Sequence, residues 1–308
     1  MRAKTAANTG CWSDFAMLSL QDYLKKLKTI EFHTRMKTRE GMVGTYHSAF
    51  KGRGMSFSES RAYVEGDDVR YVDWNASARM RSLCVKQFVE ERELSVCILL
   101  DLSPSMFFGS ISLTKAEAAI EAMSMVSFSA LHNNDRVCLI IFDGSGYKII
   151  PFTKGYHRSV QFILEAMQFH GEGSPCDLKD GMTRAMQMLK RRSLVFIISD
   201  FYGQDYELQL KQLAHRHEVL PVVISDPMES QIPDLGLVIF EDPVTHEAMF
   251  CDTSLPEMRF RFKIHALERE KYQNELFKRA CAAPIRLSTT SNIEIPLTRA
   301  FDQRACHV

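Results

Sequence analysis

The feature that most constrains the fold is a repeated alternation of short apolar runs with helical stretches through the middle of the chain. Four runs are apolar along nearly their whole length: SVCILL, RVCLIIF, SLVFII and VLPVVIS. Strands that are apolar on both faces belong in a sheet that helices cover on both sides. Because crossovers in such a sheet are right-handed, the pattern predicts an α/β fold with a doubly wound, mostly parallel sheet.

Several further elements are expected around these strands. The run KIIPFT follows RVCLIIF after a glycine turn that is too short for a crossover, so it should pair antiparallel at one edge of the sheet. More strands are expected in LGLVIFED and IRLSTT, and a short helical end after Pro296. The apolar spacing predicts helices over residues 114–132, 159–169, 178–190, 207–215 and 257–282.

The chain divides into four segments by pattern. Residues 1–43 form a helical lead-in whose apolar positions recur at helical spacing from Leu20 to Ile30, and Met17 just before this pattern is an alternative translation start. Residues 44–94 are dense in glycine, charge and aromatics and predict a module of turns and short strands. The α/β domain follows over 95–245, and a helical extension over 246–308.

Composition narrows the class of protein. Lysine and arginine balance aspartate and glutamate to a formal charge of zero, so no general attraction to nucleic acid is expected. No apolar run approaches the roughly 20 residues of a membrane helix, so no membrane span is expected. The eight cysteines are dispersed without a CxxC pair, and Cys97 and Cys138 lie inside apolar runs. Buried thiols of this kind suit a reducing compartment, and we expect the cytoplasm.

Polar residues follow the apolar runs where a ligand site is expected. Asp101, Ser103 and Ser105 come directly after SVCILL, and Asp200 comes after SLVFII. In open α/β sheets, ligands bind outside the carboxyl ends of the strands, and these ends converge at one rim. A carboxylate with two hydroxyls and a second carboxylate suits a hard cation, so we expect Mg²⁺ or Mn²⁺ there. The alternative is that Asp101 hydrogen-bonds backbone amides while the serines form a turn and a helix cap.

The DxSxSM pattern resembles the metal-ion-dependent adhesion site of von Willebrand A domains. The longer set GRG, SRAYVEGDDVRYVDW, SAR, VKQFVEERE and LLDLSPSM resembles the bacterial family called domain of unknown function 58, over roughly residues 44–255. The resemblance implies a von Willebrand A-like fold. It also implies that Asp101, Ser103 and Ser105 bind the metal directly or through water, with Asp200 as the acidic residue from the later strand.

One loop departs from the family pattern. Members of this family usually show Gly-Gly-Thr-Asp-Leu, with the threonine hydroxyl at the metal, where this chain has Ser174-Pro175-Cys176-Asp177-Leu178. A thiol or thiolate is a poor partner for a hard ion such as Mg²⁺. The remaining ligand is therefore open between Ser174, Cys176 and Asp177, and a low affinity for Mg²⁺ is the other reading.

These residues support one main function and two alternatives. The main prediction is a non-enzymatic, protein-binding adaptor whose metal accepts an acidic side chain of a partner. The resemblance implies a MoxR-type AAA ATPase or another von Willebrand A protein as that partner, because such proteins are commonly encoded together. One alternative is a metal-free scaffold with a degenerate site. The other is a Mg²⁺-dependent enzyme of phosphoryl transfer or hydrolysis, although GxSxG, GxxxxGK and HExxH motifs are absent.

A second acidic group lies in the segment EGDDVRYVDW. Asp67, Asp68 and Asp73 could form a catalytic cluster, but arginines alternate with them in the sequence. We favour an ion-paired, hydrogen-bonded module that fixes turns against the main domain, with Trp74 as its apolar anchor.

Overall fold

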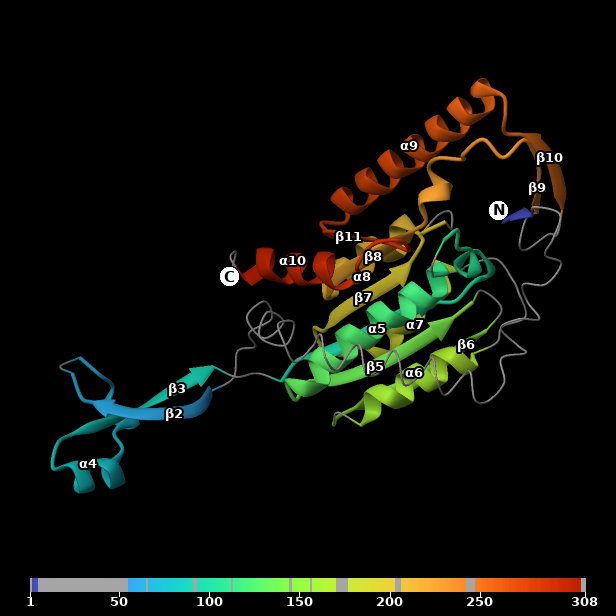
Figure 1. The fold of residues 1–308 in the computed structure, drawn as a ribbon. Coiled ribbons are helices and arrows are strands. Elements are labelled where there is room, and N and C mark those ends of the chain that lie inside the picture. The colour runs from blue at the N-terminus through green and yellow to red at the C-terminus, as the bar shows by residue number, and fades with distance from the viewer. Residues whose placement is uncertain are drawn as a thin grey trace.

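The computed structural model describes residues 2–4, 55–64, 66–90, 93–111, 113–143, 146–155, 157–169, 177–202, 206–241 and 247–305 (Figure 1). The helices predicted between Leu18 and Met42, the possible start at Met17, and the candidate ligands Ser174 and Cys176 lie outside these ranges.

The centre of the fold is a six-stranded sheet with the order β11-β8-β7-β4-β5-β6. All neighbouring strands are parallel except β5 and β6, which are antiparallel at one edge. From β4 the chain adds strands outward on one side and then on the other, so the order reverses between β4 and β7. The predicted fold class, a doubly wound, mostly parallel sheet with one antiparallel edge strand, is confirmed. The strands are β4 (Ser95–Asp101), β5 (Arg136–Phe142), β6 (Tyr147–Thr153), β7 (Leu194–Ser199), β8 (Glu218–Ser225) and β11 (Ile285–Ser288).

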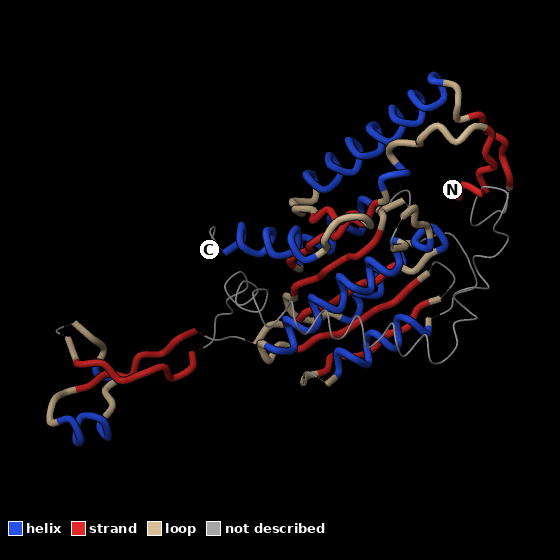
Figure 2. The backbone as a smooth tube through the Cα atoms, viewed as in Figure 1, coloured by secondary structure: helices blue, strands red, loops and turns tan. Residues whose placement is uncertain are grey.

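Helices cover both faces of this sheet (Figure 2). Alternate residues of a strand point to opposite faces, so Ile98 and Leu100 of β4 pack into one apolar core while Cys97 and Leu99 pack into the other. The first core includes α5 (Lys115–His132), α6 (Arg158–Gln168) and α10 (Glu294–Ala305). The second core includes α7 (Leu178–Met188), α8 (Glu207–Arg216) and the end of α9 (Pro256–Arg279).

The two strands expected in LGLVIFED and IRLSTT are present, but they belong to different sheets. β11 comes from the predicted C-terminal extension, yet it pairs with β8 as a strand of the central sheet. By contrast, β9 (Leu237–Glu241) leaves that sheet and pairs antiparallel with β10 (Ala248–Asp252) and with β1 (Arg2–Lys4). The reason lies in its pattern: Val238 and Phe240 are buried while their neighbours are partly or fully exposed, which suits a sheet covered on one face.

The segment before β4 forms a small module of its own. Two antiparallel strands pair with each other, β2 (Met55–Ala62) and β3 (Cys84–Glu90). The segment that connects them contains the 3-10 helix η2 (Val69–Tyr71) and the helix α4 (Trp74–Met80). Asp73 accepts hydrogen bonds from the backbone amides of Asn75 and Ala76 at the start of α4. Asp73 is therefore a helix cap, which is a structural role and not the catalytic role considered from the sequence.

Ion pairs hold the turns of this module. Arg61 lies 2.7 Å from Asp67, and Arg70 lies 2.8 Å from Asp68. The ion-paired reading is therefore confirmed. The prediction that Trp74 is the apolar anchor of this module is wrong, because Trp74 is 68% exposed. As the first residue of α4 directly after the cap, Trp74 faces solvent. Among the module's residues whose burial is described, the buried apolar ones are Val72, Cys84 and Val85.

The described cysteines are free, and Cys97 and Cys138 are fully buried side by side on β4 and β5. Their prediction as small buried apolar residues is confirmed. None of the helices in the described ranges combines the length and the apolar character that a membrane span requires.

Candidate functional site

The fold brings the predicted ligand residues of two strands to one rim. Asp101 ends β4 and Asp200 follows the end of β7, and these strands are neighbours at the point where the sheet order reverses. Ser103 and Ser105 lie directly beyond Asp101, at the 3-10 helix η3 (Pro104–Phe107). Asp101, Ser103 and Asp200 are buried, whereas Ser105 is partly exposed. The prediction that ligands would gather outside the carboxyl ends of the strands thus fits the place of these side chains.

Hydrogen bonds orient the Asp101 carboxylate. Its Oδ1 accepts from the backbone amide of Ser103 at 2.9 Å, and its Oδ2 accepts from the hydroxyl of Ser199 at 2.6 Å. The hydroxyl oxygens of Ser103 and Ser105 lie 3.3 Å apart. Asp101 therefore takes part in the local turn that was the alternative interpretation, and the two serine hydroxyls lie together in the same turn. The contact of Ser199 was not predicted, although its place one residue before Asp200 is a usable signal.

Asp200 is held by a buried cation that the sequence analysis missed. The ammonium of Lys115, at the start of α5, lies 2.6 Å from Asp200 Oδ2 and 2.6 Å from Glu229 Oε1. Only 1% of the Lys115 side chain is exposed. Burial by itself would lower the pKa of Lys115, but the two carboxylates outweigh it and raise that pKa above its ordinary value. Lys115 is therefore charged. No local sequence signal indicates its burial, because a lysine at the start of a helix is normally expected in solvent.

Aromatic and amide side chains surround this ion group. The Lys115 ammonium lies 4.9 Å from the centre of the Tyr202 ring, and the Arg269 guanidinium lies 4.1 Å from the same ring. Arg269 also donates a hydrogen bond to the Tyr202 hydroxyl. Gln273 of α9 donates to the backbone carbonyl of Asp200 at 3.2 Å. These contacts fix the loop after β7 against α9.

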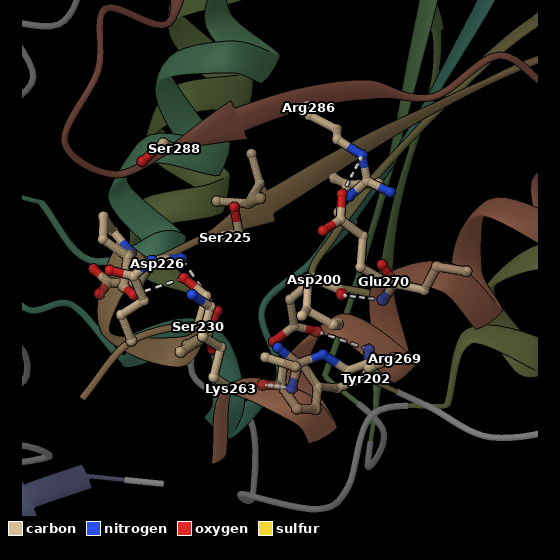
Figure 3. A pocket seen from close by; sticks show the side chains of 18 residues that line it. Asp200, Tyr202, Ser225, Asp226, Ser230, Lys263, Arg269, Glu270, Arg286 and Ser288 are labelled. Atoms are coloured by element: carbon tan, nitrogen blue, oxygen red, sulfur yellow. Dashed lines mark hydrogen bonds and ion pairs between the residues drawn. The ribbon is translucent and has the colours of Figure 1, made fainter. Parts of the chain in front are cut away.

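A cavity of about 460 Å³ lies beside Asp200 (Figure 3). Asp200 and Tyr202 belong both to the rim and to the wall of this cavity, and the rest of the wall comes from β8, η4 (Pro227–Glu229), α9 and β11. Most of the residues that line the cavity are polar, and the charged ones are of both signs. They are Asp200, Asp226, Glu229, Lys263, Arg269, Glu270 and Arg286.

Asp226 connects three loops at the same end of the sheet. Its Oδ2 accepts from the Thr289 hydroxyl at 2.6 Å and from the Ser110 amide at 3.0 Å, and its Oδ1 accepts from the Met228 amide at 2.9 Å. Burial works to raise the pKa of Asp226, but the hydrogen bonds from Ser110, Thr289 and Met228 outweigh it and lower that pKa. Asp226 is a structural carboxylate that sequence reasoning did not select.

Of the three candidate ligands in the loop before α7, which are Ser174, Cys176 and Asp177, only Asp177 lies in the described part of the chain. Asp177 is exposed and accepts a hydrogen bond from the Asp180 amide at 3.1 Å, which makes it the cap of α7. Within the described residues there is no group of three or more histidine, cysteine, aspartate or glutamate side chains that could hold a metal ion. A hard cation at this rim would therefore depend on hydroxyls as well as on Asp101.

The donor set fits a hard cation in part. Asp101, Ser103 and Ser105 supply a carboxylate and two hydroxyls at one place, which are oxygen donors of the kind that Mg²⁺ and Mn²⁺ prefer. Asp200 does not fit the same role, because Lys115 binds one of its oxygens and the Tyr202 amide donates to the other at 3.1 Å.

Comparison with known proteins places the chain in a family. Residues 59–272 match the model of the family described as protein of unknown function DUF58. The uncharacterized protein Rv1480 of Mycobacterium tuberculosis and the uncharacterized protein Mb1516 of Mycobacterium bovis are each 30% identical over 219 residues, which covers 70% of this chain and 69% of theirs.

The solved structures that match this chain have low sequence identity to it. BatB from Bacteroides thetaiotaomicron is 15% identical with a TM-score of 0.47, over 69% of this chain and 99% of that one. The SpRpn10 VWA domain is 14% identical with a TM-score of 0.39, over 68% of this chain and 95% of that one. The family match covers well over half of the chain, including Asp101. The chain therefore belongs to the family described as protein of unknown function DUF58.

Proposed function

We propose that this chain is a non-enzymatic, protein-binding adaptor whose contact site is the rim at the ends of β4 and β7. In this proposal Asp101, Ser103 and Ser105 hold a Mg²⁺ or Mn²⁺ ion, and an acidic side chain of the partner completes its coordination. The observation that carries the proposal is the pair of hydroxyls on Ser103 and Ser105, 3.3 Å apart, in the turn whose Ser103 amide donates to the Asp101 carboxylate. When bound, the ion supplies a positive charge that a partner carboxylate can reach.

The surroundings of the hydroxyls favour binding over catalysis. A serine nucleophile needs a general base within hydrogen-bond reach. The hydroxyl of Ser103 lies against the hydroxyl of Ser105, which is not a base at neutral pH. A phosphatase assay with Mg²⁺ and Mn²⁺ that stays at background would agree with this, whereas turnover lost in Asp101→Ala would contradict it.

The partner is proposed from chemistry and from the family resemblance. A carboxylate partner suits a divalent cation, and on the α9 side of the cavity next to Asp200 the cations Lys263 and Arg269 outnumber the carboxylate of Glu270. The resemblance makes a MoxR-type AAA ATPase or another von Willebrand A protein the candidate to test first.

Thermal unfolding with and without Mg²⁺ or Mn²⁺ tests the metal. A ligand at about 100 times its dissociation constant stabilises the native state by roughly 2.7 kcal/mol. We expect that shift in the wild type and its loss in Asp101→Ala. Asp252→Ala is the matched control, because Asp252 also binds a serine hydroxyl at 2.6 Å but lies at the surface. A wild type that responds no more than Asp101→Ala would contradict the proposed metal site.

A metal-free scaffold is the second candidate, and the Lys115–Asp200 ion pair favours it, because the rim already contains a cation. Capture of a purified MoxR-type ATPase separates the two. The metal-dependent adaptor predicts that EDTA and Asp101→Ala each abolish capture. Equal capture in EDTA and by Asp101→Ala would favour the scaffold.

A further inference from the structure

Lys115 is buried more completely than lysines normally are. It is the first residue of α5, and a capping box between Thr114 and Glu117 fixes where this helix begins. The side chain is 1% exposed, and a lysine is almost never fully buried unless it is paired. Because the capping box fixes the start of α5, it also places the Lys115 ammonium in the interior beside the rim.

Two carboxylates from different loops hold this ammonium. Asp200 is 85 positions and Glu229 is 114 positions away in the sequence, and each lies 2.6 Å from the Lys115 Nζ atom. The other oxygen of each carboxylate is also used: Asp200 accepts from the Tyr202 amide and Glu229 accepts from the Asp226 amide, both at 3.1 Å. The ion group is therefore satisfied by the protein itself.

Asp101 and Asp200 differ in what a metal ion would have to displace. One donor to Asp101 Oδ2 is the neutral hydroxyl of Ser199, whose hydrogen can rotate away so that the oxygen can accept a cation. The donor on Asp200 Oδ2 is an ammonium, which would repel a second cation and has no exposed position to move to. A divalent ion can thus bind the first carboxylate more easily than the second.

We infer that Lys115 is the resident cation of this rim, and that its ammonium keeps Asp200 out of the coordination of a divalent ion. Lys115 is then a positioning residue that decides which carboxylate binds metal. In this arrangement Asp101, Ser103 and Ser105 coordinate the ion, and one coordination position remains open for a carboxylate of the partner. This inference rests on the proposed function, because it concerns the cation proposed there.

Mn²⁺ binding, followed by loss of the electron paramagnetic resonance signal of free Mn²⁺, tests the inference in four chains. These are the wild type, Asp200→Asn, Lys115→Met and the double variant. With Lys115 present, Asp200→Asn should change the Mn²⁺ dissociation constant by less than about threefold. Lys115→Met should tighten Mn²⁺ binding by about tenfold, and adding Asp200→Asn should remove that gain.

Glu229→Gln is the matched control. It removes the other carboxylate partner but leaves the Lys115–Asp200 pair in place. In this background Asp200→Asn should still have no large effect on Mn²⁺ binding. Thermal unfolding adds a second measurement: Lys115→Met should lose stability in EDTA and recover it in Mn²⁺, because the metal then neutralises Asp200.

The outcomes separate this inference from the proposed function. If Asp200→Asn weakens Mn²⁺ binding about tenfold while Lys115 is present, the inference is overturned and the metal site stands. If Mn²⁺ binds Lys115→Met but not the wild type, Lys115 is the resident cation and the metal-dependent function is refuted. Binding to neither chain overturns both. The Asp200→Asn comparison in the natural background decides the inference even if Lys115→Met does not fold.

Discussion

The hydroxyl of Ser199 donates a hydrogen bond of 2.6 Å to Asp101 Oδ2, joining the ends of β7 and β4 across 98 positions of sequence. Both side chains are fully buried. Ser199 also accepts a hydrogen bond of 2.9 Å from the Phe201 amide, so its hydroxyl oxygen is held by the turn that follows β7. The bond lies where the sheet order reverses, and it sets the orientation of the carboxylate on which the proposed site depends.

Ser199→Ala should therefore destabilise the fold. The substitution leaves a buried carboxylate oxygen without this donor, which costs about 1–3 kcal/mol. Urea unfolding measures the loss. Ser254→Ala is the control, because Ser254 donates to Asp252 at the same 2.6 Å on the surface, and its effect should stay within about 0.5 kcal/mol. Equal losses in the two variants would show that burial does not decide the strength of this bond.

Acid should weaken the fold partly through Asp226. Its pKa in the folded chain lies below the unfolded value, so its stabilising contribution is present above about pH 3.9 and is lost as the pH falls through the folded pKa. The difference in unfolding free energy between wild type and Asp226→Asn should be largest near neutral pH and shrink in acid.

Thr289→Val supplies the matched variant for this prediction. It removes the hydroxyl that donates to Asp226 Oδ2 at 2.6 Å, so the pKa of Asp226 should rise and the acid-induced loss should begin at higher pH. Chemical unfolding across a pH series measures both effects. A wild-type advantage over Asp226→Asn that does not vary with pH would contradict the assignment.

Gly109→Ala should disturb the loop that leads into α5. A Cβ at this position would overlap the carbonyl oxygen of Leu113 and lie 2.7 Å from the Cα of Thr114, and neither backbone atom can move cheaply. We expect a loss of about 1–3 kcal/mol in thermal unfolding. Gly146→Ala is the control, since its nearest neighbour would be the Asp143 carboxylate at 4.0 Å. A neutral Gly109→Ala would show that this approach of the backbone is not required.

Trp74→Ala should leave the stability nearly unchanged. The side chain is 68% exposed, and exposed substitutions generally change stability by no more than about 0.5 kcal/mol. Val72→Ala in the same module removes buried methyl groups and should cost about 1.5 kcal/mol in thermal unfolding. If Trp74→Ala cost as much as Val72→Ala, the tryptophan would be packed after all.

The strands of the central sheet could be predicted because their signal is local. Runs such as SVCILL and SLVFII are apolar on both faces, and only a sheet covered on both sides accommodates them. The short turn before KIIPFT left no room for a crossover, so β6 had to be antiparallel. Pattern was less informative for Trp74, whose exposure depends on what packs against it in the folded module, and for β9, which pairs with the distant strand β1.

By itself the sequence determined the doubly wound sheet and the position of Asp101 to Ser105 at a strand end, because periodicity and strand ends are properties of consecutive residues. Only the tertiary structure decided which groups those residues meet. A lysine at a helix start is compatible with solvent in the sequence, and the packing of α5 against the loops of β7 and η4 buries Lys115 between Asp200 and Glu229. Charge pairing across 85 and 114 positions is set by the crossovers of the fold, which no local pattern encodes.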